Sequence, residues 1–235
     1  ELAPLGDIFR KAGHRLYVVG GTVRDLLLDR QMDEVDFDFT TNARPEETKR
    51  LLTGWADAVW TTGERFGTIS AQKNGRTYEI TTHRAEAYSP DSRKPDVEFS
   101  DDIATDLSRR DFTINAMYYD PQTEAVLDYH NGMKDLNAKI IRMIGEPTQR
   151  YREDPVRMLR AIRFAAKTGF VIEKETLAPI EQLGDLIQDV PSSRLFDEIL
   201  KLLMSGHAWA SIEGLEKVGL HHKILPLIEV ILSDE

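Results

Sequence analysis

Residues 35–40 constrain the fold of this chain most strongly, because apolar and polar side chains alternate strictly along them. Successive side chains on a strand point to opposite faces, so Asp36 and Asp38 share one face while Phe37 points into the core. Two carboxylates on one rigid strand suit a pair of magnesium ions that activates an attacking hydroxyl and neutralises a leaving pyrophosphate. By itself, an Asp-x-Asp motif more often marks a solvated strand face, so its meaning depends on the surrounding sequence.

The sequence before this strand predicts a phosphate-binding turn. Residues 15–19 (RLYVV) are typical of a buried strand, Gly20 and Gly21 of a tight turn, and the following VRDLLL of a helix. Glycine lets the backbone approach a ligand closely, the start of a helix offers free amide groups to a triphosphate, and Arg24 adds a charged clamp. Without further context, a double glycine is more often a simple turn, and Arg24 with Asp25 a surface pair.

The remaining periodicity predicts an α+β chain. Further helices are expected at residues 2–12 and 45–52, and further strands at 58–61, 68–72 and 77–81. Together they indicate a mixed β-sheet flanked by helices. Residues 84–101 carry two prolines, several charges and little periodicity, which predicts a long loop. From Pro155 onward the pattern is helical, with a stop at Gly169, so we expect a catalytic head domain over residues 1–144 and an all-α domain over 145–235.

Composition excludes several classes of protein. The 235 residues include no cysteine, so any metal must be bound by Asp, Glu or His. No apolar run approaches the roughly 20 residues that cross a bilayer, and the N-terminus has no signal-peptide core, so we expect a cytoplasmic protein with no membrane partner. The net charge of -10 opposes nucleic-acid binding, yet arginines outnumber acids between residues 142 and 163 and form a local basic strip. Trp55, Trp60 and Trp209 are expected in the core.

Five motifs resemble those of one enzyme family. They are GG-x-VRD-x-LL at residues 20–28, D-x-D followed by TTNA-x-PE at 36–46, RRDFTINAM at 109–117, DYHNGMKDL at 128–136 and REDPVRMLRAIRFA at 152–165. In order and spacing they resemble the class II tRNA nucleotidyltransferase and bacterial poly(A) polymerase family, within the polymerase-beta nucleotidyltransferase superfamily. Residues 29–35 (DRQMDEV) are longer than that family's pattern, but the register of the following TTNARPE keeps Asp36 and Asp38 as the metal pair.

The resemblance implies a site for two Mg²⁺ ions and a nucleoside triphosphate. The metal ligands and catalytic carboxylates are Asp36 and Asp38, and Glu79 is the best-placed third carboxylate, although an edge-strand charge explains it about as well. The nucleotide-binding residues of the head are Gly21, Arg24, Arg110, Asp111 and Asn115. Of these, Arg110 contacts the triphosphate, because guanidinium binds phosphate with paired donors, while Asp and Asn side chains shape the ribose and base pocket.

The same resemblance places nucleotide choice in the basic strip. Asp154 and Arg157 choose C or A, and Arg160 and Arg163 support the nucleotide site. These four residues recur every three positions and are expected on one side of a helix. An Asp acceptor beside paired Arg donors can read the edge of a base as a complementary base would. A salt-bridged helix face is the usual explanation for such a charge series. Only the neighbouring motifs favour a nucleotide-binding role instead.

The implied reaction is template-independent addition of CCA to the 3′ end of tRNA from CTP and ATP, with addition of A tails to RNA 3′ ends as the alternative. Residues 63–70 (GERFGTIS) favour CCA addition, and so do residues 84–101, which resemble the loop associated with the switch from C to A. Residues 131–169, 192–203 (SSRLFDEILKLL) and 219–232 (GLHHKILPLIEVIL) instead resemble the bacterial poly(A) polymerase neck. A non-catalytic RNA- or nucleotide-binding module and a transferase for small molecules or proteins are weaker alternatives, because the acidic pair and the base-reading pair are both present. The sequence does not determine the oligomeric state.

Overall fold

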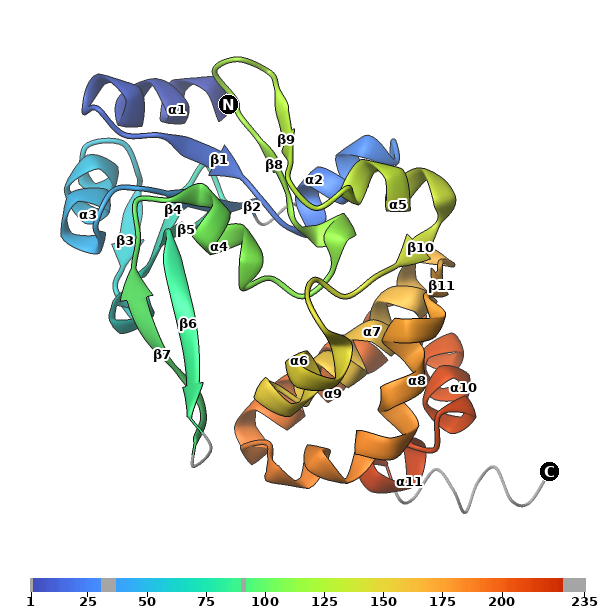
Figure 1. The fold of residues 1–235 in the computed structure, drawn as a ribbon. Helices are drawn as coiled ribbons and strands as arrows, with labels where there is room; N and C mark the ends of the chain where they lie inside the picture. The colour runs from blue at the N-terminus through green and yellow to red at the C-terminus, as the bar shows by residue number, and fades with distance from the viewer. Residues whose placement is uncertain (1, 31–36, 90–91, 226–235) are drawn as a thin grey trace. The chain divides into compact units, whose positions relative to one another are not determined.

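A mixed sheet of seven strands forms the centre of the N-terminal part of the chain (Figure 1). The computed structural model describes residues 2–30, 37–89 and 92–225. Across the sheet the strands follow the order β3 (Ala58–Trp60), β4 (Thr68–Lys73), β5 (Arg76–Thr82), β2 (Phe37–Thr41), β1 (Leu16–Val18), β8 (Met117–Tyr119) and β9 (Val126–Asp128). β2 and β5 run parallel, whereas the other neighbours in this sheet run antiparallel. The predicted mixed sheet is therefore confirmed.

Helices cover this sheet, and an aromatic core fixes its central strands. The helical segments are α1 (Leu2–Lys11), α2 (Gly21–Leu27), α3 (Pro45–Thr53), α4 (Ile103–Ser108) and the 3-10 turns η1 (Glu64–Phe66) and η2 (Thr113–Asn115). α1 packs against β1, α2 against β8, and α3 against β3 and β4. Phe37 and Phe39 are buried against Tyr78 of β5, while Asp38 is exposed on the opposite face. Trp55 meets Tyr78 edge-on, with 5.0 Å between the ring centres. This contact helps to hold β5, which pairs with the strand that carries Asp38.

Residues 84–101 form two strands rather than the expected long loop. β6 (Arg84–Ser89) and β7 (Ser92–Phe99) pair in a two-stranded sheet separate from the central one (Figure 1). A two-stranded ribbon does not need one buried apolar face, so it lacks the alternation by which strands are recognised in a sequence.

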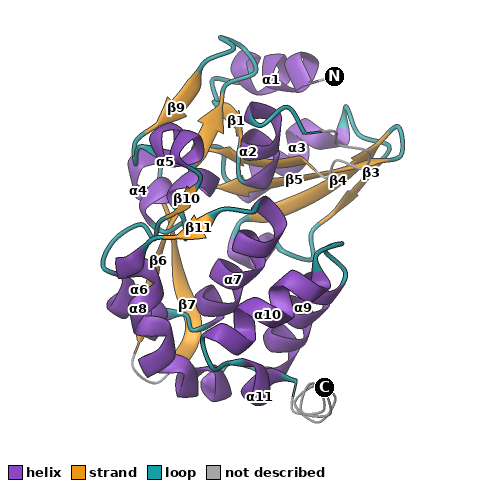
Figure 2. Cartoon of the chain, turned by 90° about the vertical axis from the view of Figure 1, so that its right-hand side faces the viewer, coloured by secondary structure: helices purple, strands orange, loops and turns teal. Residues whose placement is uncertain are grey.

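The C-terminal part is almost entirely helical, as expected. Its elements are α5 (Gly132–Ala138), β10 (Ile140–Ile141), α6 (Pro147–Glu153), α7 (Val156–Thr168), β11 (Val171–Ile172), α8 (Lys174–Leu183), η3 (Gly184–Asp189), α9 (Ser192–Leu203), α10 (Ala208–Lys217) and α11 (His221–Ile224). α7 is the central helix, since it packs against α6, α9 and α10 (Figure 2). It ends at Gly169, whose φ of 74° is the left-handed conformation that glycine adopts readily.

Two of the three tryptophans expected in the core are exposed. Trp60 is 43% exposed because it lies on β3, which is an edge strand of the central sheet. Trp209 is 59% exposed in the first turn of α10, where its indole nitrogen donates a hydrogen bond to Glu213. Trp55 is half-buried, where its ring packs against Tyr78, so the expectation of a core position holds only in part even there.

The chain forms two compact units. The sheet unit comprises residues 1–87 and 95–133, and the helical unit comprises residues 88–94 and 134–235. The base of the β6–β7 hairpin therefore belongs to the sheet unit, and its tip to the helical unit. Among the helices that the structure describes, none is long and apolar enough to cross a membrane.

Candidate active site

Asp38 lies on the exposed face of β2, directly opposite Glu79 of β5. The strands are parallel and in register at this pair, so both side chains leave the same face of the sheet, on strands about 4.8 Å apart. β5 lies between β4 and β2, so Glu79 is not an edge-strand charge. Asp36, the other predicted metal ligand, lies outside the described residues. Within the described ranges, no group of three or more His, Cys, Asp or Glu side chains could hold a metal ion.

The predicted glycine turn brings the backbone close to this acidic pair. Gly20 follows β1 and has φ 74° and ψ −145°, a conformation that residues with a side chain rarely adopt. A Cβ atom on Gly20 would lie 3.7 Å from Oδ2 of Asp38. α2 begins at the next residue, Gly21, and no side chain caps its first turn. The structure therefore places the turn and Asp38 side by side.

Arg24 is turned into the fold. Its side chain is 1% exposed, and its Nε and Nη2 donate to the two oxygens of Asp25 at 2.8 and 2.9 Å, so this pair is buried rather than on the surface. Its Nη1 donates to Oδ1 of Asn115 at 2.7 Å. Nδ2 of Asn115 donates to Oδ1 of Asp111 at 3.4 Å. Three predicted nucleotide-binding residues thus form one hydrogen-bonded chain in the sheet unit.

Arg110 is held by a buried carboxylate. Its Nη2 donates to Oδ2 of Asp106 at 3.1 Å, and its Nε donates to the hydroxyl of Tyr118 at 2.6 Å. The Tyr118 hydroxyl donates in turn to the same carboxylate oxygen. Burial alone would raise the pKa of Asp106, but Arg110 and Arg109 beside it hold that pKa well below its usual range. Asp106 is therefore an anion that fixes the orientation of Arg110.

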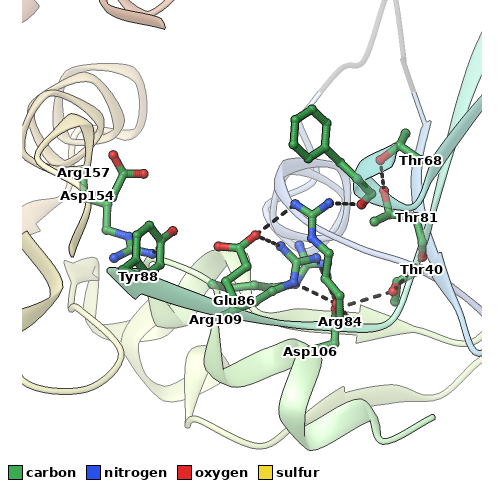
Figure 3. Close-up of polar contacts among 12 residues, drawn as sticks. Thr40, Thr68, Thr81, Arg84, Glu86, Tyr88, Asp106, Arg109, Asp154 and Arg157 are labelled. Carbon is green, nitrogen blue, oxygen red and sulfur yellow. Dashed lines mark hydrogen bonds and ion pairs between the residues drawn. The ribbon is translucent and has the colours of Figure 1, made fainter. Parts of the chain in front are cut away.

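The same carboxylate anchors the base of the β6–β7 hairpin (Figure 3). Arg109 donates from Nε to Oδ1 of Asp106 at 2.9 Å and from Nη1 to Glu86 of β6 at 3.3 Å. Arg84 donates to Glu86 from Nη2 at 2.9 Å, and its backbone amide donates to Oδ1 of Asp106 at 3.2 Å. Because positive and negative groups alternate, each carboxylate in this cluster faces more than one donor.

His83 lies beside this cluster, between β5 and β6. The residue is 1% exposed, and its Nδ1 is 2.7 Å from Oγ1 of Thr40. Burial lowers the pKa of His83 to about 4, although the Asp106 carboxylate acts in the opposite direction. The imidazole is therefore neutral at pH 7.

In the helical unit, Asp154 accepts an ion pair from a residue that the motifs do not contain. Asp154 lies between α6 and α7, because Pro155 occupies the N-cap of α7. It is 8% exposed, and Arg194 of α9 donates from Nη2 to its Oδ2 at 2.8 Å. Its Oδ1 is buried and has no hydrogen-bond partner among the described residues. The expectation that Asp154 shares one helix with the three arginines is therefore wrong.

Arg157 lies in the first turn of α7 and is 4% exposed. Its Nη1 donates to the carbonyl oxygen of Arg150 at 2.8 Å and to Glu153 at 3.3 Å. Its Nη2 donates to the hydroxyl of Tyr88 at 3.3 Å, and its guanidinium carbon lies 5.5 Å from the centre of that ring (Figure 3). Tyr88 is part of the hairpin tip that belongs to the helical unit. The guanidinium of Arg157 is thus fixed both by hydrogen bonds and by an aromatic ring.

The two remaining predicted arginines flank one aromatic ring. The guanidinium carbons of Arg160 and Arg163 lie 5.2 and 4.4 Å from the ring centre of Phe164. Arg163 also forms an ion pair from Nε to Oε1 of Glu198 at 2.5 Å. Arg163 therefore ties α7 to α9.

Sequence reasoning missed the residues that hold the predicted ones in place, namely Asp106, Glu86, Tyr88 and Arg194. Asp106 stands four positions before Arg110, a spacing at which charges pair on helices, so this contact could have been found. The other three come from a ribbon without a recognisable strand pattern or from a helix distant in sequence, and no local spacing indicates them.

Comparison with known proteins identifies the sheet unit. A sequence model of the poly(A) polymerase head domain matches residues 16–142, more than half of the chain. The chain belongs to the poly(A) polymerase head-domain family. A second model, described as the probable RNA and SrmB-binding site of polymerase A, matches residues 169–232. The resemblance seen in the five motifs is thus confirmed.

Relatives of this head domain carry two different names. Poly(A) polymerase I of Haemophilus influenzae is 39% identical over an alignment of 236 residues that covers 96% of this chain and 51% of that protein. The CCA-adding enzyme of Lactobacillus helveticus is 41% identical over 206 residues, which are 87% of this chain and 50% of that enzyme. The crystal structure of the Bacillus stearothermophilus CCA-adding enzyme in complex with CTP is 32% identical with a TM-score of 0.82, covering 94% of this chain and 52% of that one. The chain thus spans about half the length of these relatives.

Proposed function

We propose that this chain catalyses template-independent addition of nucleotides to the 3′ end of RNA, and that its product is the CCA end of tRNA. One observation carries the proposal. In a head domain of this family, Asp38 stands on the exposed face of a rigid strand, in register with Glu79 and next to the glycine turn before α2. This arrangement suits a reaction in which a cation and a triphosphate must meet.

The carboxylates suit Mg²⁺. Hard carboxylate oxygens are the ligands that this ion prefers, and Asp38 and Glu79 supply two of them from adjacent strands. We assign Asp36 and Asp38 as the metal pair and Glu79 as the third carboxylate. When bound, two ions would activate the RNA 3′ hydroxyl for in-line attack on the α-phosphorus and neutralise the leaving pyrophosphate.

The other head residues are assigned to the triphosphate and the sugar. Gly21 offers a backbone amide at the start of α2, and Arg110 offers a guanidinium that Asp106 orients before the nucleotide binds. Asp111 and Asn115 shape the ribose and base pocket. Because its guanidinium is buried, Arg24 acts in this conformation by orienting the amide of Asn115. Its direct contact with the triphosphate stays a prediction.

Base choice is assigned to Asp154 and Arg157. Cytosine and adenine each carry an exocyclic amino donor next to a ring-nitrogen acceptor, whereas uracil and guanine carry a carbonyl acceptor next to a ring N–H. A carboxylate oxygen accepts from the amino group, and a guanidinium donates to the ring nitrogen. The buried Oδ1 of Asp154 and the fixed guanidinium of Arg157 match this pattern. The pair therefore favours C and A and repels U and G.

Addition of A tails is the second candidate. The Haemophilus relative is named a poly(A) polymerase and aligns with 96% of this chain. The neck of those enzymes is also the segment that residues 131–169, 192–203 and 219–232 resemble. A pair that accepts both C and A is needed for CCA addition, whereas a poly(A) polymerase requires rejection of C.

The test supplies labelled CTP and ATP, separately and together with Mg²⁺, to a tRNA lacking its CCA end and to an oligo(A) RNA. We expect two C and one A on the tRNA alone. Long ATP-dependent tails on either RNA would identify a poly(A) polymerase instead. Absence of any incorporation into either RNA would contradict both forms of the proposal.

A further inference from the structure

Arg194 is the cation that neutralises Asp154. It lies in the first turn of α9, 40 residues from its partner, and its Nη2 is 2.8 Å from Oδ2 of Asp154. The Asp154 side chain is 11% exposed and the Arg194 side chain 37% exposed, so the carboxylate is buried while its partner reaches it from the surface. A buried carboxylate without a partner would be strongly destabilised, and Arg194 supplies that partner.

The two carboxylate oxygens of Asp154 differ in their hydrogen bonding. Arg194 occupies Oδ2, whereas Oδ1 is buried and accepts no hydrogen bond from the described residues. Such an oxygen is costly to bury, and in native proteins it usually meets a donor from a ligand or water. The amino group of cytosine or adenine is a donor of this kind, whereas uracil and guanine present a carbonyl there.

We propose that Arg194 is a positioning residue for base selection. It holds the Asp154 carboxylate through Oδ2, so that Oδ1, which accepts no hydrogen bond from the described residues, faces the incoming base. This inference rests on the proposed role of Asp154 in base choice. It adds that the selectivity for C and A depends on a residue outside the five motifs, on a helix that contributes no other predicted nucleotide-binding residue.

A purely structural role would give a different result. If Arg194 only tied α9 to its neighbours, its loss would lower the stability of the helical unit and weaken the binding of all four nucleotides alike. A positioning role predicts that affinity for CTP and ATP falls while affinity for UTP and GTP does not. The preference for CTP and ATP over UTP and GTP therefore decreases. Base preference therefore separates the two explanations.

The experiment measures equilibrium binding of fluorescent ribose-labelled CTP, ATP, UTP and GTP to the chain, together with kcat and KM for incorporation. The variants are Arg194→Ala and Arg194→Lys. The matched control is Lys201→Met, which removes one exposed positive charge from the same helix. Thermal unfolding of each variant shows whether the fold is retained.

For Arg194→Ala we expect about a tenfold loss of the preference for CTP over UTP, the size of one well-formed hydrogen bond, with KM affected more than kcat. Arg194→Lys should restore part of the preference, and Lys201→Met should leave it unchanged. An equal loss for all four nucleotides, or an unchanged preference in a folded Arg194→Ala protein, would overturn the inference. The binding measurement needs no RNA, so it tests this inference separately from the proposed reaction. Selective binding of CTP without any incorporation would contradict the proposed reaction, and the inference would still be tested by the binding preference.

Discussion

The buried carboxylate of Asp106 offers the sharpest test of how the candidate site is held together. Replacement by Asn keeps the shape of the side chain but removes the negative charge shared by Arg109 and Arg110. Those guanidinium groups are only 14% and 16% exposed, and Asp106 has no exposed surface. Removing one partner from a buried ion cluster typically costs about 3–5 kcal/mol, because the remaining charges stay buried without compensation. We expect Asp106→Asn to lower the free energy of unfolding of the sheet unit by that amount.

The assay is urea unfolding at pH 7 followed by tryptophan fluorescence in a Trp209→Phe background. Trp55 and Trp60 both lie in the sheet unit, so the remaining signal reports on that unit alone. Asp101→Asn is the matched control, because its carboxylate is 76% exposed and pairs with Arg44 at the surface. Exposed pairs contribute about 0–1 kcal/mol, so the control should unfold nearly as the unchanged chain does.

A second consequence concerns Arg110, which loses its orienting anion in Asp106→Asn. We expect KM for the nucleoside triphosphate to rise in any molecules that remain folded. A loss of unfolding free energy below about 1 kcal/mol, within the range of an exposed pair, would refute the reasoning, since it would mean that the two arginines are compensated elsewhere.

Three further predictions concern His83 and Gly20 in the sheet unit and Arg157 in the helical unit. Because the pKa of His83 is about 4 when folded, against an ordinary 6.5, only the unfolded chain binds this proton between those pH values. The free energy of unfolding should fall as the pH drops from 6.5 to 4, by up to about 3 kcal/mol in urea titrations, and His83→Gln should remove that slope. Gly20→Ala should cost about 1–3 kcal/mol in thermal or urea unfolding and reduce incorporation, whereas Gly75→Ala, also at positive φ but with no atom within 4 Å, should strain the backbone without affecting activity. Arg157→Ala should relax the choice of C and A in incorporation assays more than it lowers stability, and unchanged selectivity would count against its base-reading role.

The elements predicted best from the sequence are those with a strong local signal. The alternation around Phe37 fixes which face of β2 enters the aromatic core, and the glycine stop at Gly169 marks the end of α7. The same rule failed for residues 84–101, because a two-stranded ribbon needs no apolar face and its pairing is decided by contacts elsewhere. Pattern reasoning therefore finds strands that build a core better than strands that do not.

The candidate site was predictable in its residues but not in their partners. Asp38 and Glu79 come from separate strands, and only the parallel register of β2 and β5 brings them opposite each other. Asp154 was predicted to lie on the arginine helix, yet Pro155 caps that helix, which begins only at Val156. Its contact with Arg194 joins two helices distant in sequence, and such tertiary ion pairs leave no periodic signal. The chemistry is thus encoded locally, whereas its orientation depends on packing.

Asp36 and Asp38 are the residues to which we assign the chemistry of nucleotide addition to RNA. The most direct measurement compares Mg²⁺-dependent incorporation of labelled CTP and ATP into a tRNA lacking CCA by the unchanged chain, Asp36→Ala, Asp38→Ala and the control Asp101→Asn. Circular dichroism verifies that each variant is folded. We expect C and A addition by the unchanged chain and the control, and none by either carboxylate variant. Appreciable turnover by folded Asp36→Ala or Asp38→Ala would contradict the metal assignment on which the proposed function rests.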